Sequence, residues 1–217
     1  MKTKIVAATC SVFIALLVCS ALIYAQELKP IKLPEVQKDG GKTLMQALSL
    51  RKTTREFSDE KIPMQVLSNM LWAAWGINRP ETGGRTAPSA INWQEIEIYV
   101  AMQEGLFIFD AKAHVLNPVL AQDIRAATGL QDFVKDVPVN LIYVADFSKI
   151  TASEQDKVFY SAADTGFISQ NVYLYCASEG LATGVRNLVD KPALAQTMNL
   201  KPEQRVILTQ SVGYPKK

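Results

Sequence analysis

The sequence is poor in the residues that most often bind metals or act as nucleophiles. It contains one histidine, His114, and three cysteines, of which only Cys176 lies beyond the apolar leader. A zinc site needs several Cys or His ligands, and a catalytic triad needs a histidine that is free to transfer protons. We therefore expect no metal site, no side-chain nucleophile, a structural His114, and a buried, inert thiol at Cys176.

An excess of positive charge is also absent. The chain carries 23 basic and 21 acidic residues, and leaving out Lys2 and Lys4 of the leader gives 21 of each. A nucleic-acid-binding protein would show a basic excess, so no nucleic-acid partner is expected. The sequence also lacks a G-x-G-x-x-G turn after a strand and a G-x-x-x-x-G-K-[ST] loop, which excludes the Rossmann and P-loop phosphate sites.

The N-terminus has the pattern of an export signal. Two lysines precede an uncharged run, Ile5–Ala25, with small residues near its end. This pattern is typical of a signal peptide, although 21 residues also suffice for an uncleaved membrane anchor. In both cases the body is exported to the periplasm or held outside the cytoplasm, and only this segment meets the membrane. We divide the chain into this leader (1–25), an extended arm (26–42) rich in Pro, Gly and Lys, and one domain (43–217).

The domain alternates helical and strand patterns, but a hairpin interrupts the alternation. A helix beginning near Pro63 has apolar residues at helical spacing, and a long helix ends at Gly180. Its small residues Ala162, Ala163, Gly166 and Ser169 would let another backbone approach closely. These patterns predict an α+β fold, a mixed central sheet wrapped by helices. The other expected elements are a helix at 43–50, a hairpin at 96–110, a helical stretch at 118–135, and strands at 138–147 and 205–214.

The segment RKTTREF, residues 51–57, concentrates charge directly after the first of these helices. The guanidinium of Arg51 could grip a phosphate monoester through two hydrogen bonds, and Lys52 and Thr53 could add donors. Arg55 could contact another part of the same ligand. The alternative is a solvated basic helix end, where the helix dipole attracts cations.

Two further segments change the balance between these alternatives. TAPSAINWQEIEIYV (86–100) has a Pro-Ser turn before a strand, and FISQNVYLYCASEGLATG (167–184) ends the long helix in a glycine turn. Taken alone, Ser89 could be a plain turn residue, and Asn92 and Gln94 could cap the strand. Together with SLRKTTREFSDEKIP, however, the three segments resemble, in order and spacing, the nitroreductase family of FMN-dependent oxidoreductases. The resemblance covers roughly residues 42–215 and is greatest to the branch that forms thiazoles and oxazoles in peptides.

The resemblance implies a homodimer, with the long helix at its centre and an FMN in each of two interface sites. Arg51, Lys52 and Thr53 would hold the FMN phosphate and ribityl chain, and Arg55 would lie near the N1–O2 edge of the flavin. The remaining candidates are Pro88, Ser89 and Asn92, which would contact the ring from the other subunit, and the backbone around Val185–Asn187, which would lie near flavin N5.

The expected function is therefore an FMN-dependent oxidoreductase that transfers a hydride through flavin N5 to a small-molecule substrate. The usual donor in this family is NADH or NADPH, which is doubtful for an exported protein. The alternatives are a flavin- or ligand-binding module without turnover, and a dehydrogenase that modifies a peptide within a complex. Two departures from the family pattern stand out. Ala90 replaces a common second serine, and the chain ends in GYPKK, so that Lys216 or Lys217 must supply any further phosphate contact.

Overall fold

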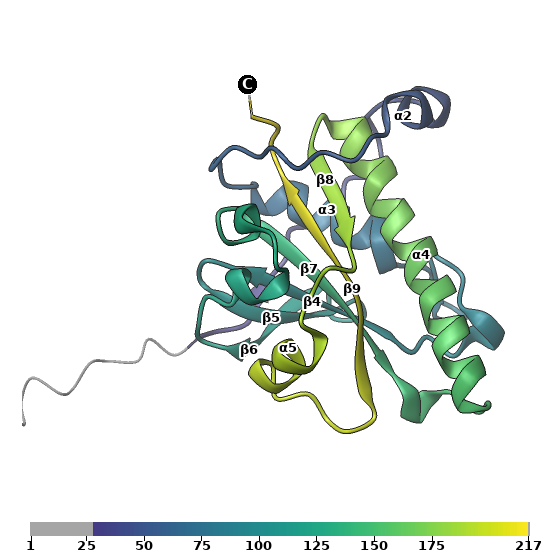
Figure 1. The fold of residues 1–217 in the computed structure, drawn as a ribbon. Coiled ribbons are helices and arrows are strands. Elements are labelled where there is room, and N and C mark those ends of the chain that lie inside the picture. Colours follow the sequence, from purple (N-terminus) through teal and green to yellow (C-terminus); the bar gives the residue numbers. More distant parts are fainter. Residues whose placement is uncertain (1–27, 217) are drawn as a thin grey trace, which may run out of the picture.

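The computed structural model describes residues 28–216, and the predicted leader lies outside them. Seven strands form one sheet in the order β1-β6-β5-β4-β7-β9-β8, shown in Figure 1 with helices against it. A two-stranded ribbon, β2-β3, lies apart from this sheet. The strands are β1 Ile31–Lys32, β2 Ile77–Arg79, β3 Gly84–Arg85, β4 Ile96–Met102, β5 Gly105–Asp110, β6 Val115–Leu120, β7 Val139–Asp146, β8 Ala182–Arg186 and β9 Gln204–Gly213.

The longest helix is α4, Glu154–Glu179, which runs along one side of the molecule and ends beside β8 (Figure 1). The Ser153 side chain accepts a hydrogen bond from the Asp156 N–H at its start, and Gly180 ends it with a φ of 74°. A left-handed φ is accessible to glycine without strain, so this helix ends where the sequence predicted. The other helices are α2 Leu44–Leu50, α3 Met64–Trp75 and α5 Lys191–Thr197, with 3₁₀ turns at Ala90–Asn92, Arg125–Thr128, Asp132–Lys135 and Phe147–Lys149.

Strand β7, which lies between β4 and β9 in the sheet, is buried on both faces. Its side chains alternate between two apolar clusters: Leu141 and Tyr143 pack with α3 and α4, whereas Ile142 and Val144 pack with α5 residues such as Leu194. Because successive side chains of a strand point to opposite faces, an unbroken apolar run is what a strand between two helical layers requires. The α+β class and the long helix are thus confirmed.

The sheet differs from the predicted mixed sheet, because every pairing between described strands is antiparallel. Helix α4 returns the chain so that β8 runs in the same direction as β7. Strand β9 then inserts between them and pairs antiparallel with both. The crossover that suggests parallel pairing is present, but its two strands are not neighbours.

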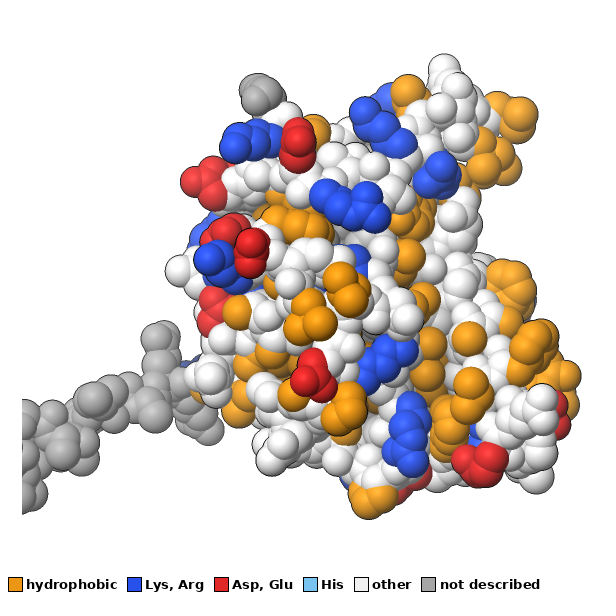
Figure 2. Space-filling model, viewed as in Figure 1, with side chains coloured by type: hydrophobic (Ala, Val, Ile, Leu, Met, Phe, Trp, Pro, Cys, Tyr) orange, Lys and Arg blue, Asp and Glu red, His pale blue; other side chains and the backbone are white. Residues whose placement is uncertain are grey.

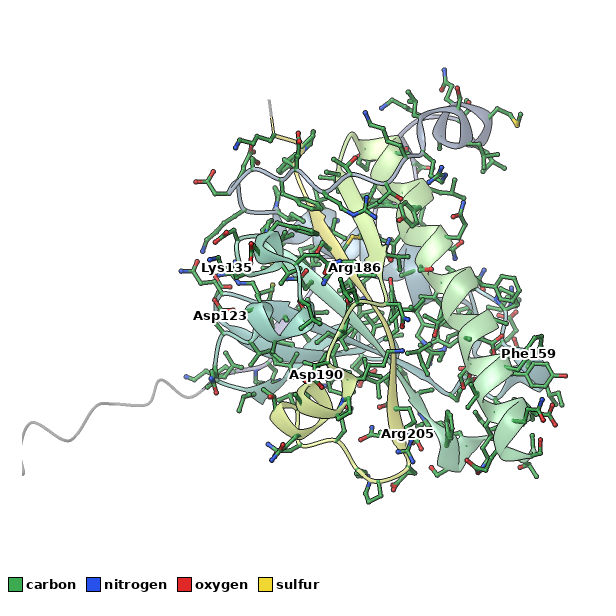
Figure 3. All side chains as sticks on the ribbon, viewed as in Figure 1. Asp123, Lys135, Phe159, Arg186, Asp190 and Arg205 are labelled. Atoms are coloured by element: carbon green, nitrogen blue, oxygen red, sulfur yellow. The ribbon has the colours of Figure 1, made fainter. Side chains whose placement is uncertain are left out.

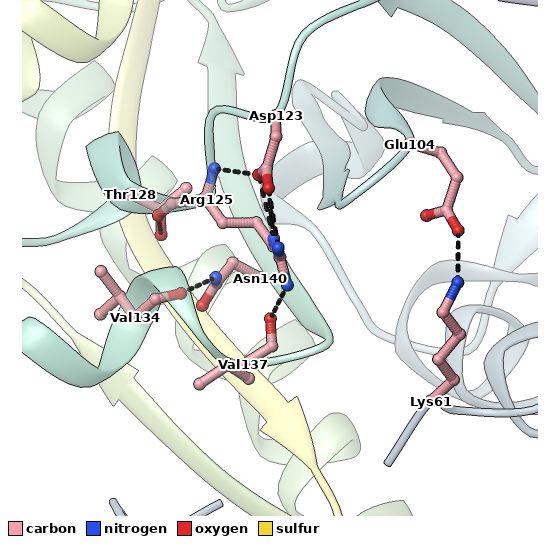
Figure 4. Close-up of polar contacts among 8 residues, drawn as sticks. All are labelled: Lys61, Glu104, Asp123, Arg125, Thr128, Val134, Val137 and Asn140. Atoms are coloured by element: carbon pink, nitrogen blue, oxygen red, sulfur yellow. Dashed lines mark hydrogen bonds and ion pairs between the residues drawn. The ribbon is translucent and has the colours of Figure 1, made fainter. Parts of the chain in front are cut away.

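The predicted helical stretch at 118–135 is wrong. Residues up to Leu120 pair with β5 as strand β6, and two short 3₁₀ turns follow. The Arg125 guanidinium forms an ion pair with Asp123 at 2.7 Å and donates to the Val137 carbonyl (Figure 4). These local contacts hold the segment as a folded loop. Helix α5 was not predicted, although Asp190 caps it and Pro192 lies in its first turn.

Among residues 28–216, no helix combines the length and the apolar character that a membrane crossing requires.

Candidate functional site

The basic segment at residues 51–55 lies on the outer edge of β8. Helix α2 ends at Leu50 with Arg51 as its C-terminal cap, and the chain then runs past the tip of the sheet beside β8 (Figure 1). The Thr54 N–H donates to the Thr183 carbonyl at 2.9 Å. A side chain at Gly184 would meet the Thr54 carbonyl oxygen at 3.1 Å, so the glycine allows this close approach. The segment therefore docks on the strand edge and does not extend into solvent as a frayed helix end.

Tyr173 of α4 joins this segment to the strand. Its hydroxyl lies 2.9 Å from Thr53 Oγ1 and accepts the Val185 N–H at 3.0 Å. The guanidinium carbon of Arg51 lies 5.4 Å from the centre of the Tyr173 ring, within cation–π range. The side chain of this tyrosine is only 8% exposed. Arg51 and Thr53 are thus held together by one fixed aromatic residue.

Lys52 lies on a different side of the segment from Arg51 and Thr53. It lines a cleft of ≈ 260 Å³ together with Lys42, Thr54 and Tyr173, and the remaining lining is mostly small and apolar. Alternate residues of an extended chain point in opposite directions, which explains why neighbours separate in this way. Figure 2 shows Lys and Arg side chains gathered on this part of the surface, near the end of α4 and α2.

Arg55 lines a second and larger cleft, of ≈ 870 Å³. Phe57, Phe133 and Lys216 also line it, with the two phenylalanine rings stacked at 5.7 Å. The Lys216 N–H donates to the Glu56 carbonyl at 3.3 Å, which keeps the C-terminal lysine at this cleft and not beside Lys52. Lys217 lies outside the described residues.

The turn that carries Pro88, Ser89 and Asn92 forms a second group of candidate residues. Ile91, Asn92 and Gln94 have φ values of 50°, 60° and 50°. Such values are costly for side chains other than glycine, so the surrounding structure must hold the turn in place. Ser89 Oγ accepts the Gln94 N–H at 3.1 Å, and Asn92 Oδ1 accepts from the Gln94 side chain at 2.9 Å.

Buried carboxyl groups support this turn from beneath. Asp164 of α4 is 2% exposed and accepts the Ala90 N–H at 2.9 Å. Glu95 is fully buried, and burial, together with the neighbouring Asp164, raises the pKa of its carboxyl group to about 7. Burial also raises the pKa of Asp164, against its hydrogen bonds with Ala90 and Glu95. The arrangement fits a neutral Glu95 that donates its proton to an ionised Asp164.

One chain does not bring the two groups of residues together. Tyr173 and Asp164 are nine residues apart on α4, which separates them by about 14 Å along the helix axis. Between and beside them, α4 exposes Val158, Phe159 and Phe167, and Figure 3 shows Phe159 pointing away from the molecule. Ser169 is buried within its own chain, so the expected small-residue face is reduced to Ala162, Ala163 and Gly166.

The outer edge of β8 carries two backbone contacts. Thr183 and Val185 use their outward-facing backbone groups on Thr54 and Tyr173. Asn187 follows β8 directly and is exposed, and if the alternation of the strand continues by one residue its N–H turns outward. Its neighbour Arg186 points inward (Figure 3) and donates to the Thr128 carbonyl at 2.8 Å and to Asn140 Oδ1 at 2.9 Å. Burial lowers the pKa of Arg186 to about 10.

Sequence reasoning missed Tyr173, Asp164 and Lys42. Tyr173 lies in an apolar stretch and Asp164 in the middle of a helix, so neither has a local signal of function. Only the packing of α4 against β8 and against the turn reveals their contacts.

His114 and Cys176 have structural roles, as predicted. His114 Nε2 lies 2.7 Å from Ser68 Oγ, and burial raises the pKa of the Cys176 thiol well above its usual range.

Comparisons with known proteins agree on one family. The model of the nitroreductase family matches residues 48–214. A candidate nitroreductase from Methanocaldococcus jannaschii is 30% identical over 164 residues, which are 70% of this chain and 81% of that protein. The crystal structure of a candidate nitroreductase from Ralstonia eutropha is 40% identical, with a TM-score of 0.84, over 88% of this chain and 92% of that one.

A more distant structure has the same fold. The NADPH:FMN oxidoreductase from Vibrio harveyi, solved with NAD⁺, is 15% identical with a TM-score of 0.62. The match covers 80% of this chain and 69% of that one. At this identity the likeness concerns the fold alone.

Proposed function

The chain belongs to the nitroreductase family, and on this basis we propose that it is an FMN-dependent oxidoreductase that transfers a hydride to a small-molecule acceptor. One observation carries the proposal: the basic segment is docked on the edge of β8, with Arg51 and Thr53 fixed by Tyr173. These groups form a row of donors for an elongated anionic ligand.

The donor types fit FMN. The guanidinium of Arg51 and the hydroxyl of Thr53 are suited to a phosphate monoester, with Lys52 and Lys42 adding positive charge nearby. Asn187 lies two residues beyond Val185 along the strand edge, about 7 Å further on. Its N–H would then face the flavin ring, and Arg55 would contact the ring from the neighbouring cleft. FMN would supply the redox chemistry, while these residues bind it and set its orientation.

We propose that the active form is a homodimer. Pro88, Ser89 and Asn92 lie about 14 Å along α4 from the Tyr173 group, so a second copy would bring its own turn to the site. The exposed apolar side chains of α4 and those of α2, such as Leu44 and Met45, are suited to such an interface. A two-fold axis would pair the same faces of both copies.

The visible spectrum of the purified full-length chain, solubilised in mild detergent, tests the function. We expect bound flavin that is bleached by a donor and regains its colour with an acceptor. NADH, NADPH and a reduced quinone are the donors to compare. Protein that purifies and reconstitutes without flavin would refute the proposal. Bound flavin that never cycles would instead indicate a binding module.

We also propose export, on the basis of the lysines and apolar run at residues 1–25. Mass spectrometry of the native protein should find a start between residues 20 and 30, or an intact chain in the membrane fraction. An intact chain in the soluble cytoplasm would contradict this proposal. In the exported protein, a quinol or another flavoprotein would replace the nicotinamide donor.

A further inference from the structure

The hydroxyl group of Tyr173 stands between two other polar groups. It accepts the Val185 N–H at 3.0 Å, and it lies 2.9 Å from Thr53 Oγ1. The bond from Val185 has a fixed direction, because a backbone N–H can only donate. The bond between the two hydroxyl groups has two possible directions, since each can donate or accept.

The neighbouring groups favour one of these directions. If Thr53 donated to Tyr173, the tyrosine proton would have no acceptor among residues 28–216. Because Tyr173 is only 8% exposed, a hydroxyl proton without an acceptor is unfavourable there. If Tyr173 donates to Thr53 instead, both of its bonds are satisfied. The proton of Thr53, whose side chain is exposed, is then directed to a ligand.

We infer that Tyr173 is a positioning residue that polarises a hydrogen-bond chain, from the Val185 N–H through Tyr173 and Thr53, and so makes Thr53 a donor to an anionic, acceptor-only ligand group. This inference rests on the proposed function, in which that group is the phosphate of FMN. A phosphate dianion only accepts hydrogen bonds, so it stabilises the same direction that burial favours. Bonds in such a chain strengthen one another, and charge on the final acceptor strengthens them further.

The tyrosine also acts through its ring, and the two roles are separable. The ring faces the Arg51 guanidinium at 5.4 Å, and a phenylalanine would keep this contact. Tyr173→Phe therefore removes only the hydroxyl group. Thr53→Val removes the end of the chain while keeping the shape of the side chain. The matched control is Tyr175→Phe, also on α4, because Tyr175 lines a different groove together with Trp72 and Asn69.

The experiment measures FMN and riboflavin affinity by titration at pH 8 for the full-length protein, the two variants, the double variant and the control. Riboflavin has the same ring but no phosphate. We expect Tyr173→Phe and Thr53→Val each to weaken FMN binding about tenfold. Riboflavin binding should change by less than about twofold. The double variant should be no weaker than either single variant, because one chain is broken in each case.

The outcomes separate the inference from the proposed function. If the wild-type protein binds neither flavin, the proposed function fails. Two results would show that Tyr173 does not act through Thr53 on the phosphate, and the inference would then be wrong. In the first, the wild-type protein binds FMN but the losses in FMN affinity of the two single variants add up in the double variant. In the second, the variants lose as much affinity for riboflavin as for FMN. An unchanged FMN affinity in Tyr173→Phe would overturn the inference as well. Backbone amide exchange provides a second readout: Val185 should exchange faster in Tyr173→Phe and remain protected in Tyr175→Phe.

Discussion

The backbone N–H of Ala90 donates to the Asp164 carboxylate at 2.9 Å, and this contact ties the strained turn at residues 88–94 to the long helix. Glu95 lies fully buried beside this aspartate. Two carboxyl groups in one buried place are tolerated when they share a proton. The turn that would face the flavin of a partner therefore depends on a group that titrates near neutral pH.

The free energy of unfolding should reflect this titration. The pKa of Glu95 is about 7 in the folded protein, against about 4.3 for an unperturbed glutamate. The folded state thus binds more protons between these values, so the contribution of Glu95 to stability is complete below pH 4.3 and is lost as the pH rises through 7. Urea unfolding should show a loss of roughly 1–3 kcal/mol between pH 5 and 8.

Glu95→Gln is the matching variant for this measurement. It keeps the size and a donor toward Asp164, but it cannot ionise. The decline in the free energy of unfolding between pH 5 and 8 should be smaller in this variant. Lys149, whose charge lowers the pKa of Glu95, is still present in it. An equal decline in both proteins would mean that other groups cause it.

Arg51 and Arg55 should differ in their effects on bound flavin. Arg51→Ala removes a contact to the phosphate, which is the same in oxidised and reduced FMN. Arg51→Ala should therefore weaken the binding of oxidised and reduced FMN alike, by about 2–5 kcal/mol. Arg55→Ala removes a cation near the ring edge, where negative charge appears on reduction. It should lower the midpoint potential, with 30 mV corresponding to about 1.4 kcal/mol for a two-electron couple.

Flavin titration and dye equilibration distinguish these effects. The structure supports different roles, because Arg51 contacts Tyr173 whereas Arg55 lines another cleft. A solvated basic segment would predict no change in either variant. If Arg55→Ala changes the flavin affinity but not the midpoint potential, Arg55 does not lie at the ring edge. The assignment of the chain to the family would still hold.

The exposed face of α4 should control association. Phe159 is 66% exposed, and Leu130, on a loop away from this helix, is 65% exposed. Full burial of a phenylalanine side chain is worth about 1.5–3 kcal/mol, so Phe159→Asp should weaken the dimer by at least about tenfold, with Leu130→Asp as the control. Sedimentation over a concentration series measures this. A wild-type monomer that holds FMN would contradict the dimer.

Gly166→Leu tests the same face in another way. A Cβ atom added at Gly166 would meet no side chain or neighbouring element within 4 Å, so the folded monomer should tolerate a side chain here. Overpacking against a second copy would cost roughly 1–3 kcal/mol in association. The monomer at low concentration should be no less stable to unfolding, because leucine is a better helix former than glycine, and this separates an interface effect from a folding effect.

Substitutions of Arg186 and Gly129 should have coupled effects on the free energy of unfolding. Arg186 is buried, without a carboxylate partner among the described residues, and a side chain at Gly129 would collide with its guanidinium. Gly129→Ala should therefore destabilise the protein by about 1–3 kcal/mol. In a background of Arg186→Ala, where the Thr128 carbonyl and Asn140 keep their hydrogen bonds from Thr209 and Ser211, the added cost should largely disappear. Equal costs in both backgrounds would rule out this contact.

Features of this protein that depend on interactions between neighbouring residues could be predicted from its sequence. The helical spacing after Pro63, the serine cap and terminal glycine of α4, and the alternation at 96–110 depend on neighbours within one element, so the sequence alone determines them. The same is true of the charge concentrated at 51–55. His114 and Cys176 could be set aside because no suitable partner residues exist elsewhere in the chain.

The tertiary structure decided what lies far apart in sequence. Strand β9 is the last strand in the sequence but lies between β7 and β8, and this position turns a predicted mixed sheet into an antiparallel one. Tyr173 meets Thr53 across 120 positions, and Asp164 meets Ala90 across 74. Such contacts form because packing α4 against β8 and against the turn buries apolar surface, and the polar groups buried with it must then find partners. The hydrogen-bond partners of these polar groups cannot be predicted from any local sequence pattern.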